Sequence, residues 1–151
     1  MKLLLRIAFQ LAKVYWFITR PVSAGVRVLM IRDGQALLVR HTYQEGWFMP
    51  GGGIKHGETL VQAAHREAFE ECGATLENLD LLGVYTQFFA HRNDQVILFY
   101  SDRFTLSGKS DAEIEQVAFF PLERLPEDTN PGHLRRIEEF GRGQFVKTGL
   151  W

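Results

Sequence analysis

A run of three glycines, Gly51–Gly53, followed by a strongly marked helix constrains the fold more than any other feature of the sequence. The glycines allow the backbone to approach a neighbouring group closely, where side chains would obstruct it. The helix is predicted over about Thr59 to Cys72, with Thr59 as the N-cap and Gln62 completing a capping box. Gly73 then suits the left-handed residue that ends many helices. The sequence therefore predicts a closely packed loop directly before a short, well-capped helix.

Three glutamates share one face of this helix. Glu67, Glu70 and Glu71 stand at i, i+3 and i+4, so their carboxylates project within about 100° of arc. Crowded carboxylates repel one another, and a divalent cation would remove that cost. A set of oxygen ligands favours Mg²⁺ or Mn²⁺ over zinc. Arg66 is placed to pair with Glu70 and orient it. An acidic face alone is also typical of a solvated helix, but the glycine loop favours a site for a metal ion and an anion.

A separate face of the helix is apolar. Its members, Val61, Ala64, Ala68 and Cys72, are expected to pack on a sheet. Cys72 is the single cysteine of the chain, which excludes an internal disulfide and a cysteine-rich zinc site. We interpret it as a small apolar helix residue rather than a catalytic thiol. A reducing compartment, the cytoplasm, is the expected location.

The order of the remaining elements favours a mixed α/β layer fold over a repeating strand–helix–strand unit. The chain has 151 residues, which is long enough for one compact domain and short for two. Two strands joined by a tight turn at Asp33-Gly34 are predicted over residues 24–42, and a last helix begins at Asn130-Pro131. Further segments have the composition of strands, at 81–90, 96–105 and 116–121.

The first twenty residues are predicted to form an N-terminal amphipathic helix, followed by a single domain over 21–151. The polar residues of this helix fall in one narrow stripe and the rest of its surface is apolar. The stripe consists of Lys2, Arg6, Gln10 and Lys13. These residues interrupt the apolar run, which argues against a membrane span. We expect residues 1–20 to pack on their own domain, on a second copy in a homodimer, or on a membrane surface.

The segment around the glutamates resembles the Nudix box, G-x5-E-x7-R-E-U-x-E-E-x-G-U, in which U is an apolar residue. Ala68 and Ala74 fill the two apolar positions, where bulkier residues are usual. A looser likeness to Nudix-domain segments covers most of residues 22–126. All fixed positions of the box match, at Gly52, Glu58, Arg66, Glu67, Glu70, Glu71 and Gly73.

This resemblance implies an α/β/α sandwich with a mixed sheet, in which the box forms a loop–helix–loop at a metal site. It implies that Mg²⁺, with Mn²⁺ as an alternative, is bound by Glu67, Glu70 and Glu71. A backbone carbonyl of the glycine loop helps, and Gly51 is the candidate. The position matching Glu58 supports the helix and the arginine.

A further carboxylate outside the box often completes such a site in the family. Glu113 is the first candidate and Glu115 the second, although Glu113 is equally typical of an ordinary acid at a strand edge. The catalytic residues predicted in this way are Arg66, Glu67, Glu70, Glu71 and Glu113.

The implied reaction is Mg²⁺-dependent hydrolysis of a pyrophosphate bond in a nucleoside diphosphate linked to another group. It would release a nucleoside monophosphate or a similar product. No proline lies between Ala74 and Pro121, whereas many ADP-ribose pyrophosphatases have one there, so the substrate stays open. The candidates for contact with a small nucleotide are Gly52, Gly53, Arg40, Phe88 and His91.

Two other functions are consistent with the same box. A Nudix-fold sensor binds a nucleotide without cleaving it, but such modules commonly lose box glutamates, and this chain keeps all of them. An RNA 5′-end pyrophosphohydrolase needs contacts to the RNA backbone. The formal net charge is −1, and no clear nucleic-acid surface is visible beyond the basic residues of 1–20, which weakens the RNA hypothesis.

Overall fold

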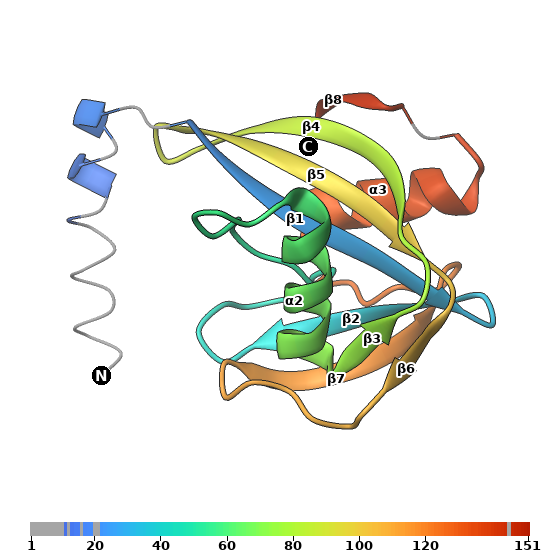
Figure 1. The fold of residues 1–151 in the computed structure, drawn as a ribbon. Coiled ribbons are helices and arrows are strands. Elements are labelled where there is room, and N and C mark those ends of the chain that lie inside the picture. The colour runs from blue at the N-terminus through green and yellow to red at the C-terminus, as the bar shows by residue number, and fades with distance from the viewer. Residues whose placement is uncertain (1–10, 12, 16, 20–21, 145) are drawn as a thin grey trace.

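A six-stranded mixed sheet with strand order β7-β2-β1-β5-β4-β8 forms the centre of the computed structural model, whose fold is shown in Figure 1. The structure describes residues 11, 13–15, 17–19, 22–144 and 146–151. A second, two-stranded sheet pairs β3 with β6. The strands are β1 (Val22–Arg32), β2 (Gln35–His41), β3 (Ala74–Leu76), β4 (Asp80–Phe89), β5 (Arg92–Ser101), β6 (Phe104–Leu106), β7 (Ile114–Pro121) and β8 (Thr148–Leu150), and the helices are α2 (Leu60–Cys72) and α3 (Pro131–Gly141).

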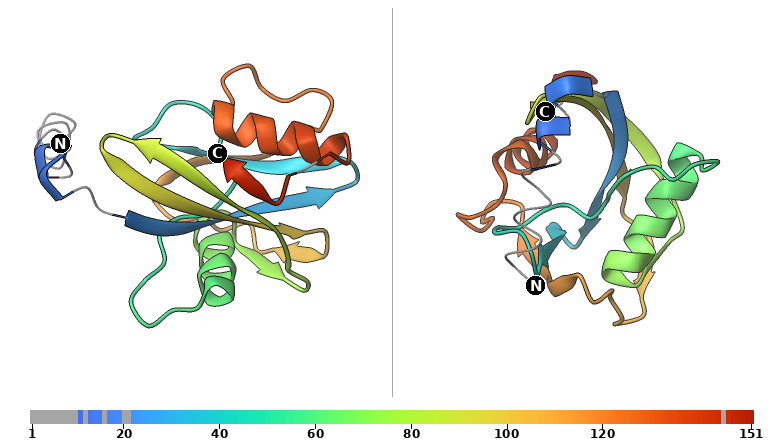
Figure 2. Two further views of the ribbon diagram at one scale, coloured as in Figure 1. Left: turned by 90° about the horizontal axis from the view of Figure 1, so that it is seen from above. Right: turned by 90° about the vertical axis from the view of Figure 1, so that its left-hand side faces the viewer.

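The two helices lie on opposite faces of the large sheet, as the left-hand view of Figure 2 shows. Alternate residues of β1 pack on the two faces of the sheet, because successive side chains of a strand point in opposite directions. Val26 and Val28 are buried in the core that contains Ala64 of α2. Leu29 is buried in the second core, with Ile137 of α3. The strand β1 is parallel to β5 and antiparallel to β2, so the predicted α/β/α sandwich with a mixed sheet is confirmed.

The elements that local signals predicted are present. The β1–β2 turn consists of Asp33 and Gly34, which have φ angles of 49° and 72°, as a tight hairpin turn requires. In α2 the Thr59 hydroxyl accepts from the Gln62 N–H and the Gln62 side chain accepts from the Thr59 N–H, which completes the capping box. Asn130 caps α3 through a bond from the Gly132 N–H at 3.1 Å.

Two local predictions were wrong. The segment 96–105 is not one strand, because β5 begins at Arg92 and ends at Ser101, where the chain turns before β6. Val61 does not belong to the packed face of α2, since 49% of its surface is exposed. Ala63 is buried in its place, together with Ala64, Ala68 and Cys72. Burial also raises the pKa of the Cys72 thiol, in agreement with a packing role.

Most of the predicted N-terminal helix lies outside the described residues. Those that are described, 11, 13–15 and 17–19, are helical and expose large apolar side chains such as Phe17 and Ile18. The Phe17 ring contacts the His91 ring in the β4–β5 turn, with centroids 5.0 Å apart. Within the described part of the chain, no helix is long and apolar enough to cross a membrane. The division into 1–20 and 21–151 stays a prediction.

Candidate functional site

The glycine loop runs alongside β1 as though it were a further strand. The Val26 N–H donates to the Gly52 carbonyl and the Val28 N–H donates to the Pro50 carbonyl, both at 2.9 Å. Gly51 has a φ of 144°, and a Cβ there would collide with the Val26 carbonyl. Glycine is therefore required at this position on two grounds, conformation and space. The result is a loop whose backbone is fixed directly against the sheet.

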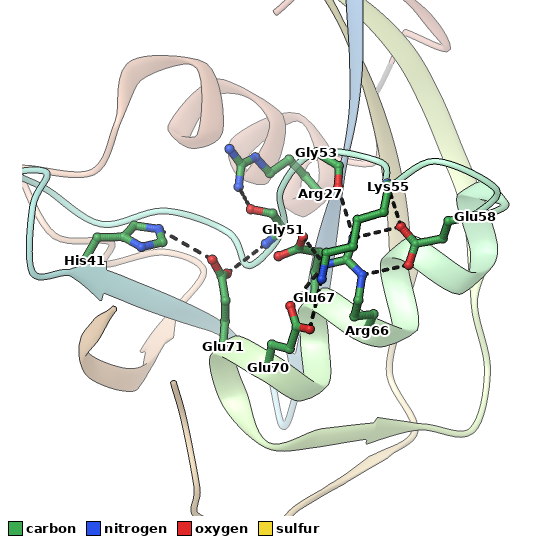
Figure 3. Close-up of polar contacts among 10 residues, drawn as sticks. All are labelled: Arg27, His41, Gly51, Gly53, Lys55, Glu58, Arg66, Glu67, Glu70 and Glu71. Carbon is green, nitrogen blue, oxygen red and sulfur yellow. Dashed lines mark hydrogen bonds and ion pairs between the residues drawn. The ribbon is translucent and has the colours of Figure 1, made fainter. Parts of the chain in front are cut away.

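The other side of the loop faces α2. A Cβ at Gly52 would lie 2.7 Å from Oε1 of Glu67, so a side chain at this position would displace the carboxylate. The loop backbone and the acidic face of α2 are thus in direct apposition, as Figure 3 shows. This is the close approach that the glycine run predicted.

Arg66 ties the loop to two of the glutamates. Its Nε and Nη2 atoms donate to the two oxygens of Glu58 at 2.7 and 2.8 Å, which is a bidentate pair. Its Nη1 atom donates to Glu67 and, at 3.0 Å, to Glu70, and Nη2 also donates to the Gly53 carbonyl at 3.0 Å. The arginine holds the pKa of Glu58 down at about 2. Arg66 therefore orients carboxylates, as its spacing from Glu70 predicted.

Glu71 is enclosed between the glycine loop and the end of β2, and its side chain is 12% exposed. Its Oε2 atom accepts from the Gly51 N–H at 2.9 Å, and Oε1 lies 3.8 Å from Nε2 of His41. Burial raises the pKa of Glu71 to about 7, although the Gly51 hydrogen bond and the charge of Arg27 act in the opposite direction. Near pH 7 its carboxylate is therefore only partly ionised, and a cation placed beside it would restore the charge.

The loop is also held from the side of α3. His133 is buried, and its Nδ1 atom accepts from the Met49 N–H at 2.9 Å. Burial lowers the pKa of His133 well below its ordinary value, so the ring is neutral and able to accept. The Trp47 N–H and carbonyl bind the Asp128 carbonyl and the Asn130 N–H at 3.2 and 3.0 Å. Residues 47–51 are fixed from both faces of the sheet.

Three residues of this site were not among the predicted site residues, namely Arg27, His41 and His133. Arg27 donates from Nη1 to the Gly51 carbonyl. Burial and the charge of Arg27 lower the pKa of His41, which is therefore neutral near pH 7. The available signal was a polar residue at an inward position, since Arg27 shares a face of β1 with the buried Leu29. This signal alone does not predict that Arg27 belongs to the site, because the sequence does not show that the glycine loop lies beside β1.

Glu113 is placed where a further carboxylate of the site could act. Its charge raises the pKa of both Glu71 and Tyr43, so it lies within electrostatic range of the enclosed acid. The Glu113 carbonyl also accepts from the Thr42 N–H at 2.9 Å, which anchors the segment beside the end of β2. Glu115, the second candidate, is exposed on β7 and has no such relation to Glu71 in the described contacts. The assignment of Glu113 stays a prediction.

The remaining substrate candidates have other contacts. The Arg40 guanidinium lies 4.9 Å from the centre of the Trp47 ring and is paired with Asp128. Phe88 is 69% exposed on β4, and His91 lies in the β4–β5 turn with a φ of 67°. None of these three has a described contact with the acids of α2, whereas Gly51, Gly52 and Gly53 lie against them or against Arg66. The predicted roles of Arg40, Phe88 and His91 remain untested.

The donor set fits a hard divalent cation. Its candidate ligands are carboxylate oxygens and one carbonyl oxygen, at Glu67, Glu70, Glu71 and Gly51. The described carboxylates do not converge on one point. Glu67 and Glu70 accept hydrogen bonds from Arg66, whereas Glu71 accepts from the Gly51 N–H. Accordingly, the described residues contain no group of three acidic, His or Cys side chains already arranged around a common centre. Binding of a metal ion would therefore require these carboxylates to exchange their present partners.

Comparison with known proteins identifies the class. The Nudix domain model matches residues 19–140, so the chain belongs to the Nudix family, and the resemblance of its box is confirmed. Nudix enzymes generally act with a divalent metal ion. Among solved structures, the MutT protein from Methanosarcina mazei Go1 is similar, with a TM-score of 0.71 and 25% identity over 82% of this chain and 95% of that one.

Two curated relatives have different printed activities. An "RNA pyrophosphohydrolase" of Xanthomonas oryzae pv. oryzae is 40% identical over 73 residues, which are 48% of this chain and 35% of that protein. The Bacillus subtilis "Putative ADP-ribose pyrophosphatase YjhB" is 31% identical over 135 residues, which are 83% of this chain and 65% of that protein. The chain spans only about a third of the length of the first relative.

Proposed function

We propose that this chain is a Mg²⁺-dependent pyrophosphohydrolase that cleaves the pyrophosphate bond of a nucleoside diphosphate linked to another group. The products are a nucleoside monophosphate, or a similar compound, and a phosphorylated remainder. The observation that supports this most directly is the apposition of a side-chain-free loop, Gly51–Gly53, and the acidic face of α2. A backbone that close to carboxylates allows a carbonyl of the loop to join them as ligands of one metal ion, which would also bind a phosphate group of the substrate.

Each residue of the site has a distinct part in this proposal. Glu67, Glu70 and Glu71, with the Gly51 carbonyl, would hold the metal, which screens the charge of the phosphate oxygens when bound. Arg66 keeps the first two carboxylates in place, and Glu58 fixes Arg66 through a bidentate pair. Glu70 or Glu113 takes the proton of the attacking water, since both acids are more accessible than Glu67.

A small nucleotide is the favoured substrate, and triphosphorylated RNA is the second candidate. The relative that matches over the larger part of this chain is named a putative ADP-ribose pyrophosphatase, which is a small-nucleotide activity. The RNA alternative is supported by the higher identity of the Xanthomonas relative over the shorter segment. The near-neutral charge of the chain favours the small molecule, because RNA affinity depends on phosphate contacts.

The proposal is tested by phosphate or mononucleotide release from a panel of nucleoside diphosphate derivatives and a 5′-triphosphorylated RNA, each with Mg²⁺. The variant Glu71→Gln removes one ligand at nearly constant shape. We expect turnover to fall by more than about 100-fold, since loss of even an outer partner of a metal costs 10- to 100-fold. Glu77→Gln, the same change at an exposed position outside the site, is the matched control.

The outcomes separate the hypotheses. Turnover of one member of the panel, lost in Glu71→Gln and kept in Glu77→Gln, supports the proposal and names the substrate class. Turnover that Glu71→Gln leaves unchanged would contradict the site. Tight nucleotide binding by a folded protein without turnover of any member would favour the sensor.

The contact of residues 1–20 with a second copy or a membrane surface remains a proposal. The exposed apolar side chains of Phe17 and Ile18 support it, because such surface is usually covered. Co-sedimentation with vesicles and the oligomeric mass, each measured for the full chain and for a chain lacking residues 1–20, distinguish the two partners. Equal behaviour of both chains in both measurements would refute the proposal.

A further inference from the structure

Arg27 is a charged residue in an otherwise apolar face of a central strand. Its neighbours on that face of β1, Leu29 and Ile31, are buried in the core beneath α3. Within the described part of the chain, its single hydrogen bond goes from Nη1 to the Gly51 carbonyl. The other N–H groups of the guanidinium have no protein acceptor there, and none of them is a buried, unsatisfied atom. The Nε and Nη2 atoms therefore keep some solvent-accessible surface, although burial lowers the pKa of Arg27.

The other cations around the site are already occupied. Arg66 donates from Nε, Nη1 and Nη2 to three carboxylates and a carbonyl. Lys55 lies 3.3 Å from Glu70, and Arg40 is paired with Asp128. Arg27, by contrast, has no carboxylate within ion-pair distance among the described residues, and Glu71 and Glu67 act on it only at longer range. Among the described residues around the site, Arg27 therefore differs from Arg66, Lys55 and Arg40 in that its charge has no carboxylate partner.

A partly buried guanidinium without a carboxylate partner carries an unfavourable desolvation cost. Arginine remains charged under such conditions and offers a planar fork that matches two oxygens of a phosphate group. Gly51 places this fork with respect to the acids, because its carbonyl accepts from Arg27 while its N–H donates to Glu71. Figure 3 shows Arg27 and Glu71 linked through this one residue.

We propose that Arg27 is a substrate-binding residue that holds the pyrophosphate group through its remaining N–H donors. Nη1 stays on one lone pair of the Gly51 carbonyl, which leaves the second lone pair of that oxygen for the metal. The inference rests on the proposed function for the presence of a pyrophosphate group. It assigns opposite tasks to the two sides of Gly51. The acids of α2 attract the metal, and the guanidinium of β1 attracts the anion that the metal also binds.

The test measures two affinities by calorimetry on the full chain. The probes are Mn²⁺ alone, and methylenediphosphonate, a non-hydrolysable pyrophosphate analogue, at saturating Mn²⁺. In Arg27→Met, which removes the charge at similar volume, we expect the dissociation constant of the diphosphonate to rise about 10- to 100-fold, as for a lost hydrogen bond to a charged group. Mn²⁺ should bind at least as tightly as in the wild type, because a positive charge near the carboxylates has gone.

Two further variants test whether a loss of diphosphonate affinity in Arg27→Met comes only from a disturbed structure. Arg32→Met makes the same change on the same strand, where the side chain lies 4.3 Å from the Phe104 ring, and should change neither affinity. Arg27→Lys keeps the charge but not the fork, so we expect a smaller loss of diphosphonate affinity and unchanged Mn²⁺ affinity. Arg27→Lys carries the test if Arg27→Met does not fold.

Unchanged diphosphonate affinity in the Arg27 variants would overturn the inference, and so would parallel loss of both affinities, which indicates a purely structural role. Turnover of the nucleotide panel distinguishes the two proposals. If the wild type hydrolyses a nucleotide and Arg27→Met keeps full diphosphonate affinity, the proposed function stands and the role of Arg27 is refuted. If the wild type binds the diphosphonate through Arg27 but hydrolyses no nucleotide, the role of Arg27 stands and the proposed reaction is refuted.

Discussion

Helices α2 and α3 cover opposite faces of the same sheet and hold the same loop, but they do so with different chemistry. From α2, the carboxylate of Glu71 accepts from the Gly51 N–H, and from α3 the imidazole of His133 accepts from the Met49 N–H, both at 2.9 Å. Burial moves both groups toward their neutral forms, since it raises the pKa of Glu71 and lowers that of His133. The neutral form of His133 is the one that accepts this hydrogen bond, whereas the neutral form of Glu71 is a weaker acceptor than its carboxylate.

The comparison shows that one loop can be held by a purely structural contact on one face of the sheet and by a candidate metal ligand on the other. The contact from α3 is complete in the protein itself, so its value is stability. The contact from α2 leaves a buried acid whose charged form is disfavoured by burial, so its value depends on what binds there. The variants below test this contrast.

The largest effect is expected in the pH dependence of stability. The folded pKa of Glu71, about 7, exceeds its ordinary value of 4.5, so the protonated acid contributes stability that is fully present below pH 4.5 and is lost as pH rises to 7. In EDTA the free energy of unfolding should fall across this window by on the order of 3 kcal/mol. Denaturant titrations at several pH values measure it. Glu71→Gln should flatten the profile, and an unchanged slope in that variant would break the comparison.

A smaller effect is expected from Glu58, which touches the acids only through Arg66. Glu58→Gln weakens the bidentate pair, so Arg66 is less well fixed and Glu67 and Glu70 are less well oriented. Loss of such a supporting partner should reduce Mg²⁺ affinity by about 10- to 100-fold. Calorimetric titration with the metal checks this, with Glu77→Gln as the control. An unaltered affinity would show that Arg66 holds the acids without help.

On the side of α3, His133→Leu removes the acceptor of the Met49 N–H and leaves that buried donor without a partner. The free energy of unfolding should fall by about 1–3 kcal/mol at pH 7. The pH dependence that His133 confers has the opposite sign to that of Glu71, because a histidine whose pKa is lowered loses stability as the pH falls below its ordinary value of 6.5. His65→Leu, at an exposed position of α2, is the matched control. A loss of activity that exceeds the loss of stability would contradict the assignment of a purely supporting role.

The smallest effect concerns the apolar side of α2. Burial raises the pKa of the Cys72 thiol, and the residue is only 4% exposed. The folded protein should therefore react with a thiol reagent at pH 8 no faster than it unfolds. Rapid labelling under native conditions would show that this face opens while the acidic face is held.

What the sequence predicted well are features with local causes. The limits of α2 follow from Thr59, Gln62 and Gly73, which act within one turn of each helix end. The break between β5 and β6 falls at a polar run, Ser101 to Arg103. It was missed because strand-forming aromatic residues flank this run on both sides, at Tyr100 and Phe104.

The site was predicted in the part that a contiguous motif encodes. Spacing placed Glu67, Glu70 and Glu71 on one face of a helix, and the family resemblance implied that Glu58 supports the arginine. The structure shows the Arg66–Glu58 pair and adds the Gly53 carbonyl as a partner of Arg66. The contributions of Arg27 and His133 could not be predicted, since each depends on a contact with the loop across a long stretch of chain. Such contacts arise only from the tertiary fold.

The pairing of β1 with β5 also has a consequence for how the protein folds. These strands are parallel and in register from Val22 with Asn93 to Met30 with Ser101, and Ser23 and Asp94 are 71 residues apart. Closing so long a loop is slow, because its entropy is lost before the contacts that reward it are made. The box helix can form early from local signals, while the loop that completes the site must wait for β1. Catalytic competence should therefore be among the last properties to appear during refolding.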